Sequence, residues 1–174
     1  MILITDELRA RLLANGATET ETNHVPVVKL FNPVGAATWL LTELDADGDT
    51  LFGLCDLGFG FPELGSVSLA ELEAIKGPLG LAIERDLGFA PRFPLSVYAE
   101  AARIAGHITE ADRLLRHAAA ALALSHSELP PGAADDERRE AQPPPLGLRP
   151  RGRTTTTEPK EKKPCNSLTF PSTD

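Results

Sequence analysis

Short apolar runs separated by turn-forming residues dominate the first two thirds of the chain. The segments 25–31, 37–44 and 50–57 are rich in residues that favour strands, and Asn, Asp or Gly follows each of them. Periodicity alone would also allow a helix over 37–44, but its short length and the Asp/Gly cluster after it favour a strand. The sequence DADGD joins the last two runs, which are therefore predicted to form a β-hairpin with a polar turn.

Two further extended segments follow the hairpin. A short strand is predicted at 64–67, directly before the start of a helix. In the segment 80–87, Leu81, Ile83 and Leu87 lie on one side of an extended chain, and acidic residues lie on the other. This period of two predicts a half-buried strand.

Capping residues mark the first two predicted helices. Thr5 can cap a helix over 6–15, and Gly16 is suited to end it in the left-handed conformation. The stretch VSLAELEAIKGP carries the clearest local signal, because Ser68 and Glu71 have the spacing of a capping box. A short helix is therefore predicted after Ser68.

The C-terminal third changes in character. A helix is predicted to begin at Ser96, and a peripheral helix is predicted over 109–126. Residues 127–174 are low in complexity and rich in proline and charge, so they cannot bury enough apolar area to offset their chain entropy. We expect a compact domain over 1–108 and a disordered tail over 127–174.

The order of these elements predicts an α+β fold. We expect a mostly antiparallel sheet of four to five strands, with the helices packed on one face.

Charge narrows the classes of partner. The formal net charge is −8, and residues 1–113 hold 17 Asp and Glu against 8 Lys and Arg. An acidic domain disfavours direct binding to nucleic acid, which needs clustered cations on the protein, but it is compatible with binding a basic protein surface. The N-terminal stretch MILITDELRARLL lacks the pattern of a signal peptide, and no apolar run approaches the length that spans a bilayer. We therefore expect a cytoplasmic protein with a protein partner and no membrane contact.

The segment DADGDTLFGLCD raises the question of a calcium site. Asp45, Asp47, Asp49 and Asp56 stand at positions 1, 3, 5 and 12, as ligands do in a helix–loop–helix calcium loop. Such a loop needs glycine at position 6, which is Thr50 here, and a second helix, which the following LGFGFPELG cannot form. The segment is therefore predicted to be a hairpin turn with solvated aspartates, and no metal or cofactor is expected.

Several carboxylates interrupt or end the apolar runs, namely Glu43, Asp56, Glu63, Glu84 and Asp86. If their strands share one sheet, these groups could converge beside Trp39 and bind a divalent cation or act as general acid and base. The favoured alternative is the solvent face of an antiparallel sheet, with Arg85 paired to a neighbouring acid.

The loop GFGFPELG holds two phenylalanines, Phe59 and Phe61. Such residues usually close the edge of a core, but joint exposure would indicate a contact with a partner. Together with the residues above they make up the candidate binding surface, which is Trp39, Glu43, Asp56, Phe59, Phe61, Glu63, Glu84, Arg85 and Asp86.

Three stretches carry a family resemblance: VVKLFNPVGAATWLLTELD, TLFGLCDLGFGFPELGSVSLAELEAI and GLAIERDLGF. They resemble the bacterial family labelled domain of unknown function 2958 over residues of about 3–105. The resemblance implies a small protein met in proteobacteria, often on plasmids and integrated elements, with no activity or catalytic residue to carry over. It also implies that residues from about 110 onward are an added extension.

Two functions follow from these observations. The favoured one is a non-enzymatic accessory or binding protein of a mobile element, which uses an acidic sheet face or the 59–63 loop. The alternative is a small metal-dependent hydrolase or nuclease that uses the sheet carboxylates.

Overall fold

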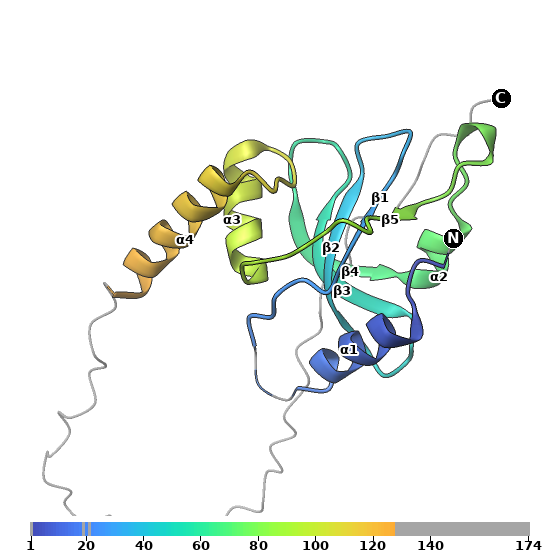
Figure 1. Cartoon of the computed structure of the whole chain (residues 1–174), viewed down its shortest axis with the longest axis horizontal. Helices are drawn as coiled ribbons and strands as arrows, with labels where there is room; N and C mark the ends of the chain where they lie inside the picture. The colour runs from blue at the N-terminus through green and yellow to red at the C-terminus, as the bar shows by residue number, and fades with distance from the viewer. Residues whose placement is uncertain (1, 19, 21, 128–174) are drawn as a thin grey trace, which may run out of the picture.

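A five-stranded antiparallel sheet organises the residues that the computed structural model describes, which are 2–18, 20 and 22–127 (Figure 1). The sheet has the order β4-β3-β2-β1-β5, which confirms the predicted α+β class. Its strands are β1 Val28–Phe31, β2 Thr38–Leu44, β3 Thr50–Asp56, β4 Glu63–Ser68 and β5 Glu84–Arg85.

The central pair β2–β3 is the predicted hairpin. Thr38 lies opposite Asp56 and Leu44 opposite Leu51, and the register shifts between Leu41 and Glu43. Gly53 lies opposite Leu41, where the two backbones are so close that a Cβ would be 2.1 Å from the Leu40 carbonyl oxygen. The apolar segment 37–44 is therefore a strand and not a helix.

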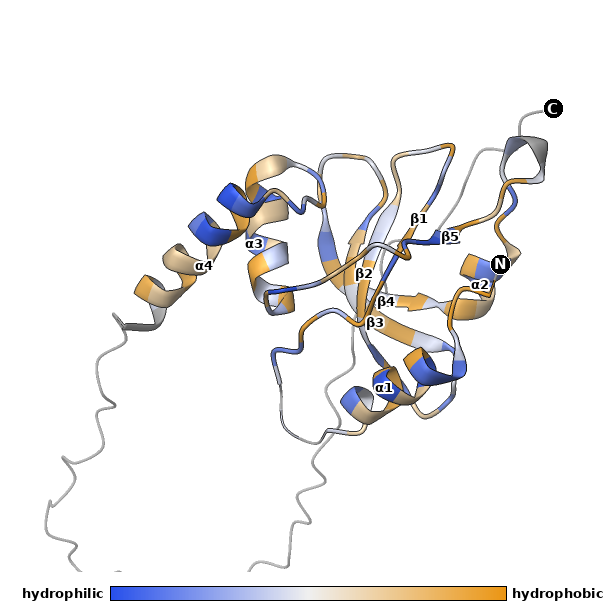
Figure 2. Cartoon of the chain, viewed as in Figure 1, coloured by the Kyte–Doolittle hydropathy of each residue, from blue (hydrophilic) through white to orange (hydrophobic). Residues whose placement is uncertain are grey.

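Helices cover both faces of this sheet, so the expectation that they pack on one face is wrong. The helices α1 Asp6–Gly16 and α2 Leu69–Ala74 pack on the face that contains Leu41 and Leu51. The helix α3 Leu95–Ala105 packs on the opposite face, which contains Leu40 and Leu54, and α4 Asp112–Ser127 packs with it. The reason lies in β2, whose sequence TWLLTEL is apolar on both sides of the strand. Figure 2 shows the central strands coloured mainly as hydrophobic.

The predicted N-caps of α1 and α2 are confirmed. Thr5 Oγ1 accepts a hydrogen bond from the Leu8 amide at 3.4 Å, and Ser68 Oγ accepts one from the Glu71 amide at 3.1 Å. The predicted left-handed stop at Gly16 is wrong, because α1 runs through this residue and its C-cap, Ala17, has right-handed helical dihedrals. Gly16 instead allows a close approach, since a Cβ there would lie 2.3 Å from the Leu44 carbonyl oxygen.

The helix α3 begins one residue before the predicted Ser96, with Pro94 as its N-cap. It ends at Ala105, and its C-cap Gly106 has a φ of 75°, the left-handed conformation that glycine adopts readily. The helix α4 contributes Leu115 and Ala118 to the core that α3 forms with the sheet.

The segment 80–87 is mostly not a strand, so that prediction is wrong. Only Glu84 and Arg85 pair with β1, and a 3-10 helix, η1 Pro78–Gly80, precedes them. Ile83 is buried, but Leu81 and Leu87 are exposed, because the short edge strand offers no neighbour to cover them. The alternation in the sequence therefore overstated the length of this strand.

Residues 128–174 lie outside the described part of the chain. They make up the whole predicted disordered tail except residue 127. Among the described helices, none combines the length and the apolar character needed to cross a bilayer.

Candidate functional site

Two aspartates of the β2–β3 turn accept hydrogen bonds from other groups of the chain. The Asp47 carboxylate accepts hydrogen bonds from the Asp49 amide at 2.9 Å, the Thr50 amide at 2.9 Å and Thr50 Oγ1 at 2.6 Å. These hydrogen bonds lower the pKa of Asp47, and the bond from the Thr50 hydroxyl has the largest effect. The predicted hairpin turn is confirmed.

Asp49 ties this turn to the start of α2. Its carboxylate accepts from Ser68 Oγ at 2.7 Å and from the Ala70 amide at 2.8 Å, while its carbonyl accepts from the Leu69 amide at 2.9 Å. Across the described residues, no group of three or more His, Cys, Asp and Glu side chains is placed to hold a metal ion. These aspartates therefore shape the turn and cap the neighbouring helix.

The sheet carboxylates do not converge on one point. Glu43 lies opposite Phe52, four residues before Asp56 on β3, so Glu43 and Asp56 stand toward opposite ends of the hairpin. Glu84 lies opposite Phe31, Phe31 lies opposite Thr38, and Thr38 lies opposite Asp56. Three strand spacings therefore separate Glu84 from Asp56. Adjacent strands are about 4.8 Å apart, which places Glu84 roughly 14 Å from Asp56 across the sheet.

Asp56 is a buried anchor for two loops. Its side chain is 2% exposed. One carboxylate oxygen accepts from the Gly58 amide at 2.8 Å, and the other accepts from the Ile108 amide at 2.9 Å. Asp56 therefore fastens the β3–β4 loop to the connection between α3 and α4.

A second anchor surrounds Lys29 on β1. Its ammonium group lies 3.0 Å from Asp86 and also pairs with Glu110. Burial lowers the pKa of Lys29, but the hydrogen bonds and charges of Glu110 and Asp86 outweigh this and raise it. The Lys29 hydrogen bond in turn lowers the pKa of Asp86. The cation beside Asp86 is thus Lys29. Arg85, which was predicted to pair with a neighbouring acid, donates instead to the Leu3 carbonyl at 3.3 Å.

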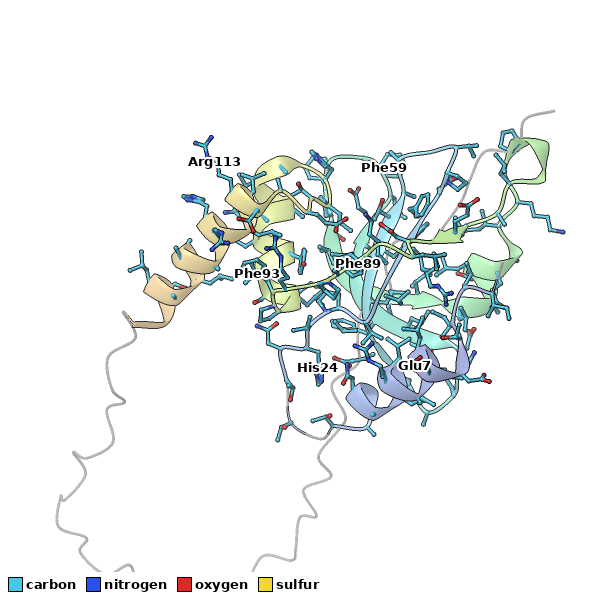
Figure 3. The ribbon with its side chains drawn as sticks, in the orientation of Figure 1. Glu7, His24, Phe59, Phe89, Phe93 and Arg113 are labelled. Carbon is cyan, nitrogen blue, oxygen red and sulfur yellow. The ribbon has the colours of Figure 1, made fainter. Side chains whose placement is uncertain are left out.

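The β3–β4 loop, residues 57–62, presents two aromatic side chains to solvent. Phe59 is 80% exposed and Phe61 is 81% exposed, so they do not close the edge of the core. Gly58 and Gly60 have φ values of 84° and 85°, the left-handed conformation that glycine adopts readily. Figure 3 shows Phe59 at the end of the molecule formed by this loop. We call residues 57–62 the phenylalanine loop.

Further exposed residues flank the phenylalanine loop. The β1–β2 turn lies against it, since a Cβ on Gly58 would be 2.6 Å from the Ala36 Cβ, and this turn carries the partly exposed Val34. Glu63 is exposed where β4 begins. Two exposed rings and an exposed acidic side chain therefore lie on one short stretch of chain at this end of the sheet.

A pocket of about 590 Å³ lies toward the other end of the hairpin. It is formed by the end of α1, the loop that follows, the strands β2 to β4 and the start of α3. Its lining includes Asn23, His24, Glu43, Phe52, Leu64 and Ser96. No sequence signal brings these residues together, because they come from segments far apart in the chain.

The predicted binding surface is thus divided by the structure. Phe59, Phe61 and Glu63 are exposed on one stretch of chain, and the buried Asp56 anchors the start of that stretch through the Gly58 amide. Trp39 is 0% exposed and belongs to the core, so a partner cannot reach it. Glu43 lines the pocket, and Glu84, Arg85 and Asp86 lie at or beside the edge strand β5.

Comparison with known proteins gives one family. The model of the family described as "Protein of unknown function (DUF2958)" matches residues 3–109, which bears out the resemblance. No curated protein and no solved structure matches the chain.

Proposed function

The chain belongs to the DUF2958 family, and we propose that it is a non-enzymatic module that binds another protein through its phenylalanine loop. The observation that carries this proposal is the joint exposure of Phe59 and Phe61. Burying an exposed phenylalanine contributes about 1.5–3 kcal/mol, so two exposed rings on one loop can provide the core of an interface.

The loop is held in place by the fold, which favours binding. Asp56 fixes its base through the Gly58 amide, and the close contact between Gly58 and Ala36 supports its side. A segment that is already ordered loses less conformational entropy when a partner binds. The anchored loop therefore supports an interaction surface.

The charge of the domain indicates the chemistry of the partner. Residues 1–127 carry 17 Asp and Glu but only 9 Lys and Arg. An acidic domain with Glu63 beside the phenylalanine loop favours a partner with basic residues around an apolar pocket, because opposite potentials speed association and exclude wrong partners. In keeping with the genetic setting that the family resemblance implies, we place this module in the cytoplasm as an accessory protein of a mobile element.

The alternative is a metal-dependent hydrolase or nuclease built on Glu43, Asp56, Glu84 and Asp86. Such an enzyme needs carboxylates around one ion or one water. The wide separation of these groups gives that alternative no support, whereas the phenylalanine loop supports binding.

Affinity measurements with wild type and variants test the proposal. A tagged chain is used to recover partners from a proteobacterial host, and the best-enriched partner is purified for titration. Replacing both phenylalanines by serine (Phe59→Ser with Phe61→Ser) should weaken its binding at least about thirtyfold, because the loss of even one buried aromatic anchor costs about 2 kcal/mol.

The matched control is Leu87→Ser, since Leu87 is similarly exposed but lies after β5. This variant should bind as wild type does. Equal affinity of the double serine variant and wild type, with circular dichroism showing both folded, would contradict the proposal.

A further inference from the structure

The phenylalanine loop and the connection between α3 and α4 are joined by one carboxylate. Asp56 accepts a hydrogen bond from the Gly58 amide at 2.8 Å with one oxygen and from the Ile108 amide at 2.9 Å with the other. The two segments also lie side by side (Figure 1), since a Cβ on Gly106 would be 3.7 Å from the Gly60 carbonyl oxygen. The loop and the connection therefore share one acceptor residue.

Burial makes this shared residue sensitive to the loss of either donor. Asp56 is 2% exposed, so its charge depends on hydrogen bonds from the chain more than on water. If the Ile108 amide moves away, a buried carboxylate loses one of these two donors and has to move or bind water in its place. Either change alters the bond to the Gly58 amide. A displacement of the connection is thereby passed to the phenylalanine loop.

The helix α4, which continues from this connection, is held by few groups. It packs with α3 through two fully buried side chains, Leu115 and Ala118. At its first residue, Asp112 pairs with Arg92 at 2.7 Å, but both side chains are about half exposed, so this pair contributes little. Release of α4 from α3 therefore exposes a small apolar area and leaves the sheet core intact.

The chain adds α4 to a joint that the family domain already contains. The part of the chain that matches the family covers residues 3–109, which include both Asp56 and Ile108 but not α4. On its other side the connection is held by the sheet, because Glu110 pairs with Lys29 of β1. The connection thus lies between a fixed contact with β1 and a helix that is less firmly attached.

We propose that α4 is a regulatory helix, whose docking on α3 controls the phenylalanine loop through Asp56. This regulation rests on the proposed function, because it acts on the same loop. With α4 docked, Ile108 bonds to Asp56, and Gly58 is held in the conformation that binds the partner. When α4 leaves α3, Ile108 withdraws, the loop loosens, and the partner binds less tightly. By linkage, a bound partner favours the docked helix to the same extent.

Nuclear magnetic resonance tests the coupling in the full chain without any partner. Leu115→Ser removes the buried anchor of α4, and the matched control Ala120→Ser introduces the same residue at an exposed position of the same helix. In Leu115→Ser the amide proton signals of both Ile108 and Gly58 should move upfield, because both hydrogen bonds to the carboxylate weaken. Ala120→Ser should leave both signals in place. The milder Leu115→Ala should shift both signals in the same direction, and it replaces the serine variant if that variant does not fold.

Three results would overturn the proposal. They are no shift of either signal, a shift of Ile108 without one of Gly58, and equal shifts in the Leu115 variant and its control. A residue that only stabilises the fold would change the free energy of unfolding and leave the Gly58 signal of the folded protein where it is.

The route through Asp56 is tested by combining two changes. In Asp56→Asn one oxygen becomes an amide nitrogen, which cannot accept, so the side chain no longer joins Gly58 to Ile108. Adding Leu115→Ser to this variant should therefore cause no further shift of the Gly58 signal. A further shift as large as that in wild type would show that Asp56 does not carry the coupling.

Partner affinity gives a second measurement that separates this inference from the proposed function. Leu115→Ser should weaken binding of the purified partner at least about fivefold, the lower end of coupling between linked sites. Ala120→Ser should bind as wild type does, and unchanged affinity of Leu115→Ser would overturn the regulation. The expected amide shifts together with wild-type affinity of the phenylalanine variants would refute the proposed function and keep the coupling. Lost affinity of the phenylalanine variants without the amide shifts would refute the coupling alone.

Discussion

Asp56 is the acidic residue whose surroundings differ most from what its place in the sequence indicates. It follows an apolar run like the other sheet carboxylates, yet it is buried and accepts two backbone amides. Thr5 and Ser68 could be predicted as caps because their partners lie three residues away. The role of Asp56 could not, because Ile108 lies 52 residues further along the chain.

Removing the Asp56 carboxylate should destabilise the domain. In Asp56→Ala the Gly58 and Ile108 amides lose their acceptor, which should lower the free energy of unfolding by about 3 kcal/mol. Urea denaturation measures this difference. The control Glu73→Ala changes an exposed residue of α2 and should alter stability by less than about 0.5 kcal/mol. A loss for Asp56→Ala no larger than that of the control would refute the anchoring role.

Asp86 should make the free energy of unfolding depend on pH in the acidic range. Its pKa is lower in the folded chain than in the unfolded chain, chiefly because Lys29 donates a hydrogen bond to it. Its contribution is therefore complete above the unfolded pKa, about 3.9, and is lost as the pH falls through the lower folded value. Unfolding by urea between about pH 6 and pH 2 should show a smaller loss in Asp86→Asn than in wild type. Identical slopes below about pH 4 would contradict this account.

At the scale of elements, local sequence patterns predicted the hairpin and the caps but not the covering of the sheet. The run TLFGLCD and the turn before it contain enough apolar, β-forming and turn residues to specify β3 and its partner. The segment 80–87 also alternates, but only Glu84 and Arg85 meet a neighbouring strand. The length of a strand thus depends on how many residues of a neighbouring strand are available for pairing, and the sequence of the segment itself does not specify this.

Gly16 offers a test of how α1 meets the sheet. In most helices a change from glycine to alanine stabilises by up to about 1 kcal/mol. Here the new Cβ would lie 2.3 Å from the Leu44 carbonyl oxygen, so Gly16→Ala should instead destabilise by about 1–3 kcal/mol. Thermal or urea unfolding shows whether the variant is less or more stable than wild type.

The control for this change is Gly88→Ala, where the nearest atom would be a flexible Asp86 oxygen at 3.4 Å. It should have little effect. A stabilised Gly16→Ala variant would show that α1 does not approach β2 as closely as described.

At the scale of the whole molecule, helices cover both faces of the sheet, and the features that could bind a partner lie toward its ends. One end carries the phenylalanine loop, and the pocket with Glu43 lies toward the other. Sequence patterns identified Phe59, Phe61 and Glu63 as neighbours because they share one loop. They could not identify the pocket, whose lining combines α1, three strands and α3.

Covalent capture at the phenylalanine loop tests the central claim most directly. A photoreactive benzoyl-phenylalanine is introduced at Phe59 in one variant and at Leu87 in another, and both are irradiated in the bacterial host. We expect one defined adduct with a basic partner protein from position 59 and none from position 87. No adduct at position 59, or the same adducts at both positions, would contradict the assignment of this loop as the binding surface.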